Sequence, residues 1–117
     1  MKKLIAAASL CVASFSVQAA IIVPEYDVEA GQKIYRAGIA AKGVAACTAC
    51  HSPTGIGNAS AAFPAVSGQH SAYVEKQLKM FRNAERSNDP NNMMRDIAAK
   101  LSDAEIKAVS AYIQGLN

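Results

Sequence analysis

The sequence predicts an all-α fold with a single domain, and three observations support this prediction. The chain has 117 residues, a length that fits one domain. Apolar residues recur at helical spacing in three stretches, which begin near residues 28, 71 and 103. No stretch alternates apolar and polar residues for long enough to indicate a half-buried strand, so no sheet of consequence is expected.

The first twenty residues are expected to form a cleaved secretory signal peptide. Two early lysines are followed by an apolar run at 4–17, and VQA at 17–19 gives the small-x-small pattern of a cleavage site. Cleavage is expected after Ala19 or Ala20, which leaves a domain of residues 21–117. The alternative is a membrane anchor, but the run is too short to span a bilayer comfortably. We therefore expect a periplasmic protein without a membrane span after processing.

Processing leaves a nearly neutral chain with two cysteines. The formal net charge falls from +3 to +1, and Cys11 is lost with the leader. Nucleic-acid binding needs a strong basic patch or stripe, so no nucleic-acid partner is expected. Cys47 and Cys50 remain, and in an oxidising compartment they must form a disulfide, bind a metal or anchor a cofactor.

The first helix of the domain is expected to begin near Val28. Val28, Gly31 and Tyr35 fall at i, i+3 and i+7 and so lie on one helical face. A glycine within a helix costs about 1 kcal/mol relative to alanine, which indicates that another element crosses closely at Gly31. The small residues of GIAAKGVAA at 38–46 then lead to CTACH at 47–51.

A loop and a second long helix are expected after CTACH. The glycines and prolines of residues 52–69 leave no helical period. Residues 71–86 are then expected to form a helix with a narrow apolar stripe. The stripe consists of Val74, Leu78 and Phe81, and the solvated side includes Lys76, Lys79 and Arg82.

The last part of the chain is expected to hold a short helical turn and a final helix. Residues 88–92, NDPNN, end the preceding helix, and residues 93–100 are expected to form the turn. Ser102 and Glu105 match a capping box, which marks the start of the final helix. The apolar stripe of that helix consists of Ile106, Val109, Ile113 and Leu116.

Three chemistries compete for CTACH. A thioredoxin-like redox pair needs a βαβ setting, which this chain lacks. A structural zinc site needs four ligands, and His70 is the only other histidine. The pattern C-x-x-C-H is the signature of covalent haem attachment, in which each thiol adds across a haem vinyl group. We therefore predict one haem c with its iron, held by Cys47 and Cys50, with His51 as an axial ligand.

A methionine is expected as the second axial ligand, because methionine opposite histidine raises the reduction potential. Residues 21–117 hold Met80, Met93 and Met94. Met80 falls inside the second long helix beside Phe81 and is interpreted as core packing. Met93 and Met94 follow a Pro-Asn-Asn turn, where a loop could return over the other face of the haem, so one of the two is expected to bind the iron.

Beyond these motifs, the chain resembles the class I c-type cytochromes. It is most similar to one domain of the dihaem cytochromes of the c-four type and to their small monohaem relatives. The resemblance covers nearly all of residues 21–117 and rests on AGQKIY (30–35), CTACH, FPAVSGQHSAYVEKQLKMFR (63–82) and RSNDPNNMMRDIAAKLSDAEIKAVSAYI (86–113). It implies the class I cytochrome c fold, with three to five helices wrapped around one covalent haem.

The resemblance also implies particular roles. The family's axial methionine lies seven residues before the leucine of the LSD motif, which selects Met94 and keeps Met93 as the alternative. Pro64 matches a proline whose carbonyl accepts a hydrogen bond from the ligand histidine. The family's first and last helices cross at a glycine and aromatic pair, matched by Gly31, Tyr35 and Tyr112. Two departures are the long 38–46 link and Ser52, where many relatives have glycine.

These observations predict a periplasmic electron carrier that cycles between Fe(III) and Fe(II) and meets redox partner proteins transiently. It is not expected to be an enzyme. One alternative is a subunit that serves as the electron port of a periplasmic oxidoreductase. Another is a haem sensor or peroxidase-like protein with a labile sixth ligand. By analogy with two-domain relatives, a homodimer is a candidate assembly. The candidates for steering an acidic partner are Lys42, Lys76, Lys79 and Arg82, with solvated helix faces as the alternative.

Overall fold

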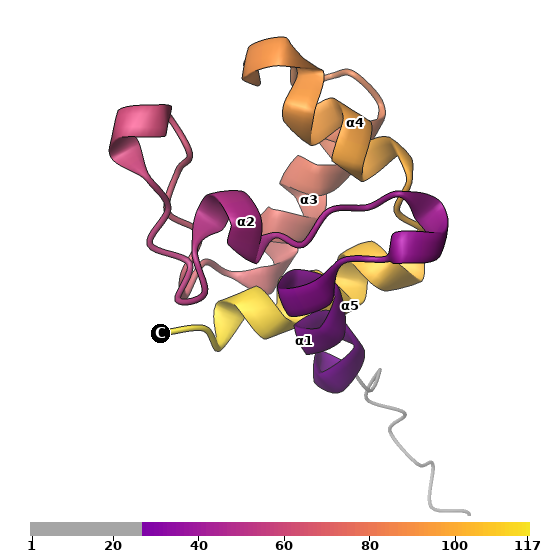
Figure 1. Cartoon of the computed structure of the whole chain (residues 1–117). Helices are drawn as coiled ribbons and strands as arrows, with labels where there is room; N and C mark the ends of the chain where they lie inside the picture. The colour runs from indigo at the N-terminus through magenta and orange to yellow at the C-terminus, as the bar shows by residue number, and fades with distance from the viewer. Residues whose placement is uncertain (1–26) are drawn as a thin grey trace, which may run out of the picture.

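The structure is a computed structural model that describes residues 27–117, so the expected signal peptide at residues 1–20 lies outside the described range. The helices are α1 (Val28–Ala37), α2 (Thr48–His51), α3 (Ser71–Arg82), α4 (Met93–Ala99) and α5 (Asp103–Gln114), with short 3-10 turns η1 (Ala40–Lys42), η2 (Ala59–Ala61) and η3 (Pro90–Asn92). Within the described range no strand forms, and the two antiparallel bridges, Ile39–Val44 and Asn58–Phe63, are isolated. The all-α prediction is confirmed (Figure 1).

Helices α1 and α5 cross at Gly31 in the lower part of Figure 1. A Cβ atom built on Gly31 would lie 2.1 Å from the carbonyl oxygen of Ala108, so only glycine permits this approach. One turn later in α1, the fully buried Tyr35 packs against Tyr112, with 5.4 Å between the ring centroids. The expected close crossing is therefore present.

The predicted face of α1 is buried only in part. Val28 is 48% exposed, whereas Ile34 is buried beside Tyr35. Val28 is the first residue of α1, directly after the N-cap Asp27, and it lies a full turn before the crossing at Gly31. The core begins at the crossing, so Val28 stays exposed although it starts the predicted helical face.

Helix α3 is shorter than the expected range of 71–86. Its stripe is buried as expected, and it ends at Arg82. Ala84 takes the left-handed conformation (φ 58°), and the backbone N–H groups of Glu85 and Arg86 both donate to the carbonyl of Met80. These bonds satisfy a carbonyl in the last turn of α3, and the chain then turns away from the helix axis.

Helix α5 begins as the sequence predicts. The Ser102 hydroxyl accepts a hydrogen bond from the backbone N–H of Glu105 (3.2 Å), and the Glu105 carboxylate accepts one from the N–H of Ser102 (2.7 Å). This reciprocal pair satisfies two donors that a bare helix end would leave without partners. The apolar residues expected for this stripe are all buried, namely Ile106, Val109, Ile113 and Leu116.

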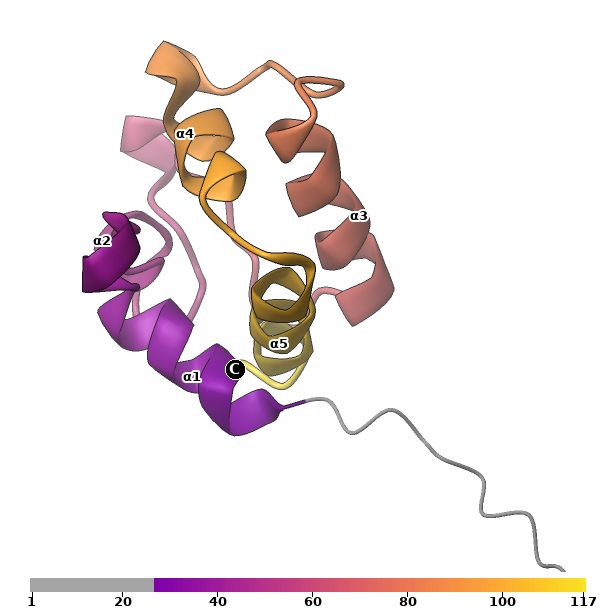
Figure 2. The same cartoon turned by 90° about the vertical axis from the view of Figure 1, so that its right-hand side faces the viewer.

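The helices are arranged around one interior space. In Figure 2, α2 and α3 lie on opposite sides of the molecule, with α4 towards the top and α5 below it. Residues from all five helices or their connections line the cavity between them. Among residues 27–117, no helix is both long enough and apolar enough to cross a membrane.

Candidate functional site

Helix α2 places the two cysteines and the histidine of CTACH on a single turn. The backbone N–H groups of Cys50 and His51 both donate to the carbonyl of Cys47, at 3.2 and 2.8 Å. Both cysteines are free and half-buried. All three side chains line a cavity of about 530 Å³, a size typical of ligand pockets.

The Cys47 thiol lies in an environment that favours its neutral form. Burial, which removes solvent from the thiolate, raises the pKa of Cys47 to about 11. A reactive redox cysteine shows the opposite behaviour, with a lowered pKa. Among residues 27–117, no three His, Cys, Asp or Glu side chains gather in a way that could hold a metal. The raised pKa of Cys47 is thus unlike that of a reactive redox cysteine.

The ring of His51 is fixed by a backbone carbonyl. Its Nδ1 atom lies 2.8 Å from the carbonyl oxygen of Pro64. A carbonyl can only accept a hydrogen bond, so Nδ1 carries the proton and Nε2 keeps a free lone pair. A histidine held in this way is oriented, and made more basic, for metal binding. The other histidine, His70, is exposed and lies outside the cavity lining.

Gly57 allows the Pro64 carbonyl to reach His51. Its backbone N–H donates to the carbonyl of His51 (2.9 Å), and a Cβ atom built on it would lie 2.3 Å from the carbonyl oxygen of Phe63. Its φ is +70°, where side chains are rarely accommodated. The loop between α2 and α3 is therefore folded tightly back against the histidine.

Ser52, directly after His51, has a backbone conformation that strongly favours glycine. Its φ is 70° and its ψ is 161°. The Tyr35 hydroxyl donates to the Ser52 carbonyl (2.7 Å), and the Ser52 hydroxyl accepts from the N–H of Ile56 (3.1 Å). These two bonds hold the residue in this conformation, which otherwise costs about 1–3 kcal/mol.

Ser52→Gly is therefore expected to be more stable than Ser52→Ala by about 1–2 kcal/mol, because only alanine keeps the strain. Both variants lose the hydroxyl bond to Ile56, so the comparison isolates the backbone. Chemical denaturation of the haem-loaded variants measures the difference. Equal stabilities, or the reverse order, would show that Ser52 is not strained.

The two methionines expected as candidate ligands line the same cavity. Met93 and Met94 begin α4, and both line the cavity that holds Cys47, Cys50 and His51. Met94 is half-buried and packs against the core, whereas Met93 is 37% exposed. Met80 lies outside the cavity lining, and its sulfur accepts a hydrogen bond from Gln77 instead. The structure brings together every residue expected at the site.

The cavity has a polar side that the sequence reasoning missed. Arg86 is the only lysine or arginine that lines it within the described residues. The guanidinium stacks 4.5 Å from the centre of the Phe81 ring and donates to Gln77 (2.8 Å) and Asn88 (2.9 Å). Asp89 also lines the cavity, and it is buried. The concentration of charged residues in RSND, shortly before the two methionines, was the available signal.

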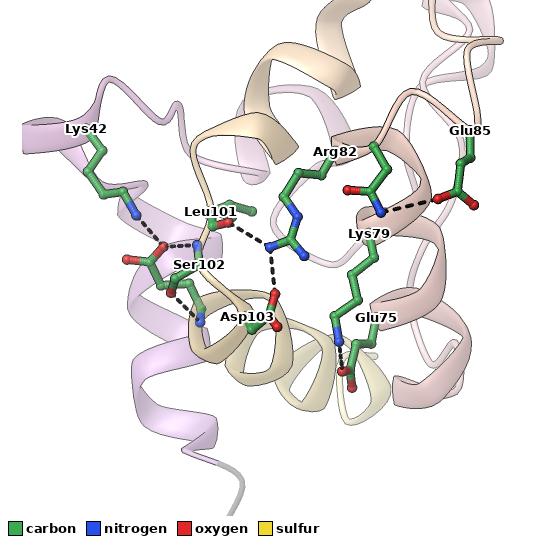
Figure 3. Close-up of polar contacts among 10 residues, drawn as sticks. Lys42, Glu75, Lys79, Arg82, Glu85, Leu101, Ser102 and Asp103 are labelled. Atoms are coloured by element: carbon green, nitrogen blue, oxygen red, sulfur yellow. Dashed lines mark hydrogen bonds and ion pairs between the residues drawn. The ribbon is translucent and has the colours of Figure 1, made fainter.

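Most of the cations considered for steering are paired within the chain. Lys42 bonds Glu105 at 2.6 Å, Lys79 bonds Glu75 at 2.7 Å and Arg82 bonds Asp103 at 2.7 Å (Figure 3). Arg82 also donates to the carbonyl of Leu101, next to the start of α5. For Lys79 and Arg82 the structure thus favours the alternative interpretation as parts of the α3 surface, and Lys42 lies at the end of the short turn η1.

The cytochrome c family model matches residues 28–117. The chain belongs to the cytochrome c family. Members of this family carry haem bound covalently, so this cytochrome binds haem c with its iron. The residues that the structure gathers fit that group, because two thiols, an oriented imidazole and two thioethers line one largely apolar cavity. The predicted class I cytochrome c fold is confirmed.

The chain is similar to three proteins whose names and coverage are informative. Cytochrome c4 of Azotobacter vinelandii is 59% identical over 91 residues, which is 77% of this chain and 43% of that protein. The structure of reduced recombinant cytochrome c4 from Pseudomonas stutzeri matches with a TM-score of 0.75 and 49% identity over 77% of this chain and 48% of that one. The structure of thiosulfate dehydrogenase from Marichromatium purpuratum matches with a TM-score of 0.71 and 33% identity. This match covers 77% of this chain and 19% of that one. The chain thus spans less than half the length of each.

Proposed function

We propose that the chain is a periplasmic electron carrier with one haem c, bound by Cys47 and Cys50 and ligated by His51 and Met94. The observation that carries the proposal is the His51–Pro64 hydrogen bond of 2.8 Å between two residues that line the same cavity as Met94. The likeness to cytochrome c4 proteins supports the same role. Residues 1–20 are proposed to direct export and to be removed.

Each of these residues would have a specific role in binding the haem. The thiols of Cys47 and Cys50 would hold the haem through thioether bonds. Pro64 holds the His51 ring through Nδ1, so Nε2 would be the atom that coordinates the iron. Arg86, whose side chain lines the cavity, would form ion pairs with the carboxylate groups of the haem. When bound, the haem supplies an iron that gains and loses one electron.

Electron transfer requires little rearrangement around the iron, and the packing here supplies a rigid frame. The apolar lining of the cavity excludes water from most of its surface, and Leu78, Val109 and Ile113 are buried parts of both the lining and the core. His51 and Met94 come from different elements, which the α1–α5 crossing and the α3–α4 packing hold together. A ligand pair supported in this way can stay in place in both oxidation states.

One observation favours a second candidate, in which the chain serves as the electron port of an oxidoreductase. The likeness to thiosulfate dehydrogenase covers 77% of this chain. Such a subunit would keep the same haem site but remain bound to its enzyme. Co-elution of the native protein with a dehydrogenase through size-exclusion chromatography at moderate salt would select this candidate over the free carrier.

The full chain, expressed with a bacterial system that attaches haem c, tests the proposal. We expect one haem per chain that acidified acetone does not extract, an intact mass that lacks the first 19 or 20 residues, and a reversible one-electron titration. A Cys47→Ala/Cys50→Ala double variant is expected to lose at least nine-tenths of the retained haem. Extractable haem in the parent chain, or two haems per chain, would contradict the proposal.

A further inference from the structure

One carboxylate of the described chain is buried, and it lines the same cavity as the proposed axial methionine. The Asp89 side chain is 3% exposed, and Asp89 and Ser110 are the only buried polar residues in the range 27–117. A buried carboxylate is costly unless charged or polar groups compensate it. Asp89 also lines the cavity that holds Met94.

Arg95 compensates this carboxylate twice, once through its backbone and once through its side chain. The backbone N–H of Arg95 donates to one carboxylate oxygen (3.0 Å), and Nε donates to the other (2.9 Å). The same guanidinium donates to the carbonyl of Ser87 (3.4 Å). Burial alone would raise the pKa of Asp89, but these donors and the positive charge hold it below its usual value.

These bonds also complete the start of α4. Asn92 occupies the N-cap position, but its side chain makes no capping bond, so the first N–H groups of α4 need other acceptors. Asp89 supplies an acceptor for Arg95, the third residue of the helix. A carboxylate near a helix N-terminus is also favoured by the helix dipole.

The loop that Asp89 closes is the one that delivers the methionine. Asn91 and Asn92 both take the left-handed conformation, with φ of 54° and 60°, and they reverse the chain between Asp89 and α4. Asp89 binds the residue immediately after Met94, so the closed loop encloses Met94 and fixes its backbone from both sides. No side-chain contact between Asp89 and Met94 is needed for this effect.

We propose that Asp89 is a positioning residue, which holds Met94 where it can remain bound to the iron. This inference rests on the proposed function, because it assumes that Met94 is an axial ligand. It assigns Asp89 a role distinct from general stabilisation. Loss of the carboxylate is expected to release the methionine while the helices stay folded.

The chain offers a solvent-exposed control in the Arg82–Asp103 ion pair, whose aspartate side chain is 70% exposed. That pair is 2.7 Å long and also joins a carboxylate at a helix start to an arginine, but neither residue lines the cavity. Asp103 is the first residue of α5, which carries no proposed ligand. Asp103→Asn should therefore reveal what the loss of such a pair does to stability alone.

The experiment compares the haem-loaded parent with Asp89→Ala, Asp89→Asn and Asp103→Asn at a temperature where far-ultraviolet circular dichroism shows each to be folded. Carbon monoxide binding by the reduced protein and the far-red thioether band of the oxidised protein report on the methionine. We expect Asp89→Ala to bind carbon monoxide at least tenfold more tightly than the parent and to lose most of the band. Asp103→Asn should match the parent in both.

Asp89→Asn provides a second test if the alanine variant does not fold, because its amide oxygen can still accept from the N–H of Arg95. We expect an intermediate loss of the band. A folded Asp89 variant that keeps the parent's band and inertness to carbon monoxide would overturn the positioning role alone. A parent protein that already binds carbon monoxide would instead overturn the proposed ligation, and with it this inference.

Discussion

Met94→Ala is expected to open the haem iron to carbon monoxide and to lower the reduction potential by tenths of a volt. Axial ligands set haem potentials over a range of about 0.8 V, and a thioether is the ligand that raises them. Met94 lines the same cavity as the oriented His51 and packs against the core, so its replacement by alanine would remove the proposed thioether ligand. Redox titration and carbon monoxide binding by the reduced protein measure the two effects.

Met93→Ala is the control for this substitution. Met93 lines the same cavity, but it is 37% exposed and contributes less to the packed core. Its replacement should shift the potential much less and leave the reduced protein inert to carbon monoxide. If the two variants show the reverse pattern, the axial ligand is Met93 and the assignment is wrong by one residue.

Gly31→Ala is expected to destabilise the haem-loaded protein by at least about 3 kcal/mol, at the upper end of the usual cost of overpacking. The added Cβ would lie 2.1 Å from the Ala108 carbonyl oxygen and 2.6 Å from its carbon, and backbone atoms cannot turn aside as a side chain can. Helices α1 and α5 would have to separate, which also disturbs the packing of Tyr35 on Tyr112. In a domain of this size the melting temperature should fall by more than about 12 °C.

Gly115→Ala is the matched control, because this glycine follows α5 at φ −92° and the nearest atom to a Cβ there is 3.8 Å away. Its replacement should change the stability by no more than about 0.5 kcal/mol. Thermal unfolding monitored by circular dichroism compares the two variants with the parent. A Gly31→Ala protein with the parent's melting temperature would show that α1 and α5 do not cross as described.

The helices were predictable where local sequence alone determines them. The Ser102–Glu105 capping box lies within one helical turn, and the stripe of α3 follows from spacing. The sequence is less informative where contacts between distant parts of the chain determine the structure. Val28 fits the spacing of α1, but the position of α5 leaves it outside the core. The end of α3 depends on the left-handed turn at Ala84, which no strong turn residue announced.

The site was predictable in part for the same reason. Cys47, Cys50 and His51 form a local motif whose spacing encodes the chemistry. Met94 and Pro64 were selected only through the resemblance to known cytochromes, because their roles depend on how two distant loops fold back over the cavity. Asp89 and Arg86 escaped notice, since a charged residue in an Asn-rich loop is usually solvated and only the fold buries it.

The visible spectrum of the exported, haem-loaded protein, recorded oxidised and reduced and with carbon monoxide added to the reduced form, tests the central claim most directly. That claim is a covalent haem c whose iron is closed by His51 and Met94. It predicts a reduced c-type spectrum that carbon monoxide does not change, together with a weak far-red thioether band in the oxidised protein. A reduced spectrum that shifts on addition of carbon monoxide would contradict it and would favour a sensor or peroxidase-like protein with an open sixth site.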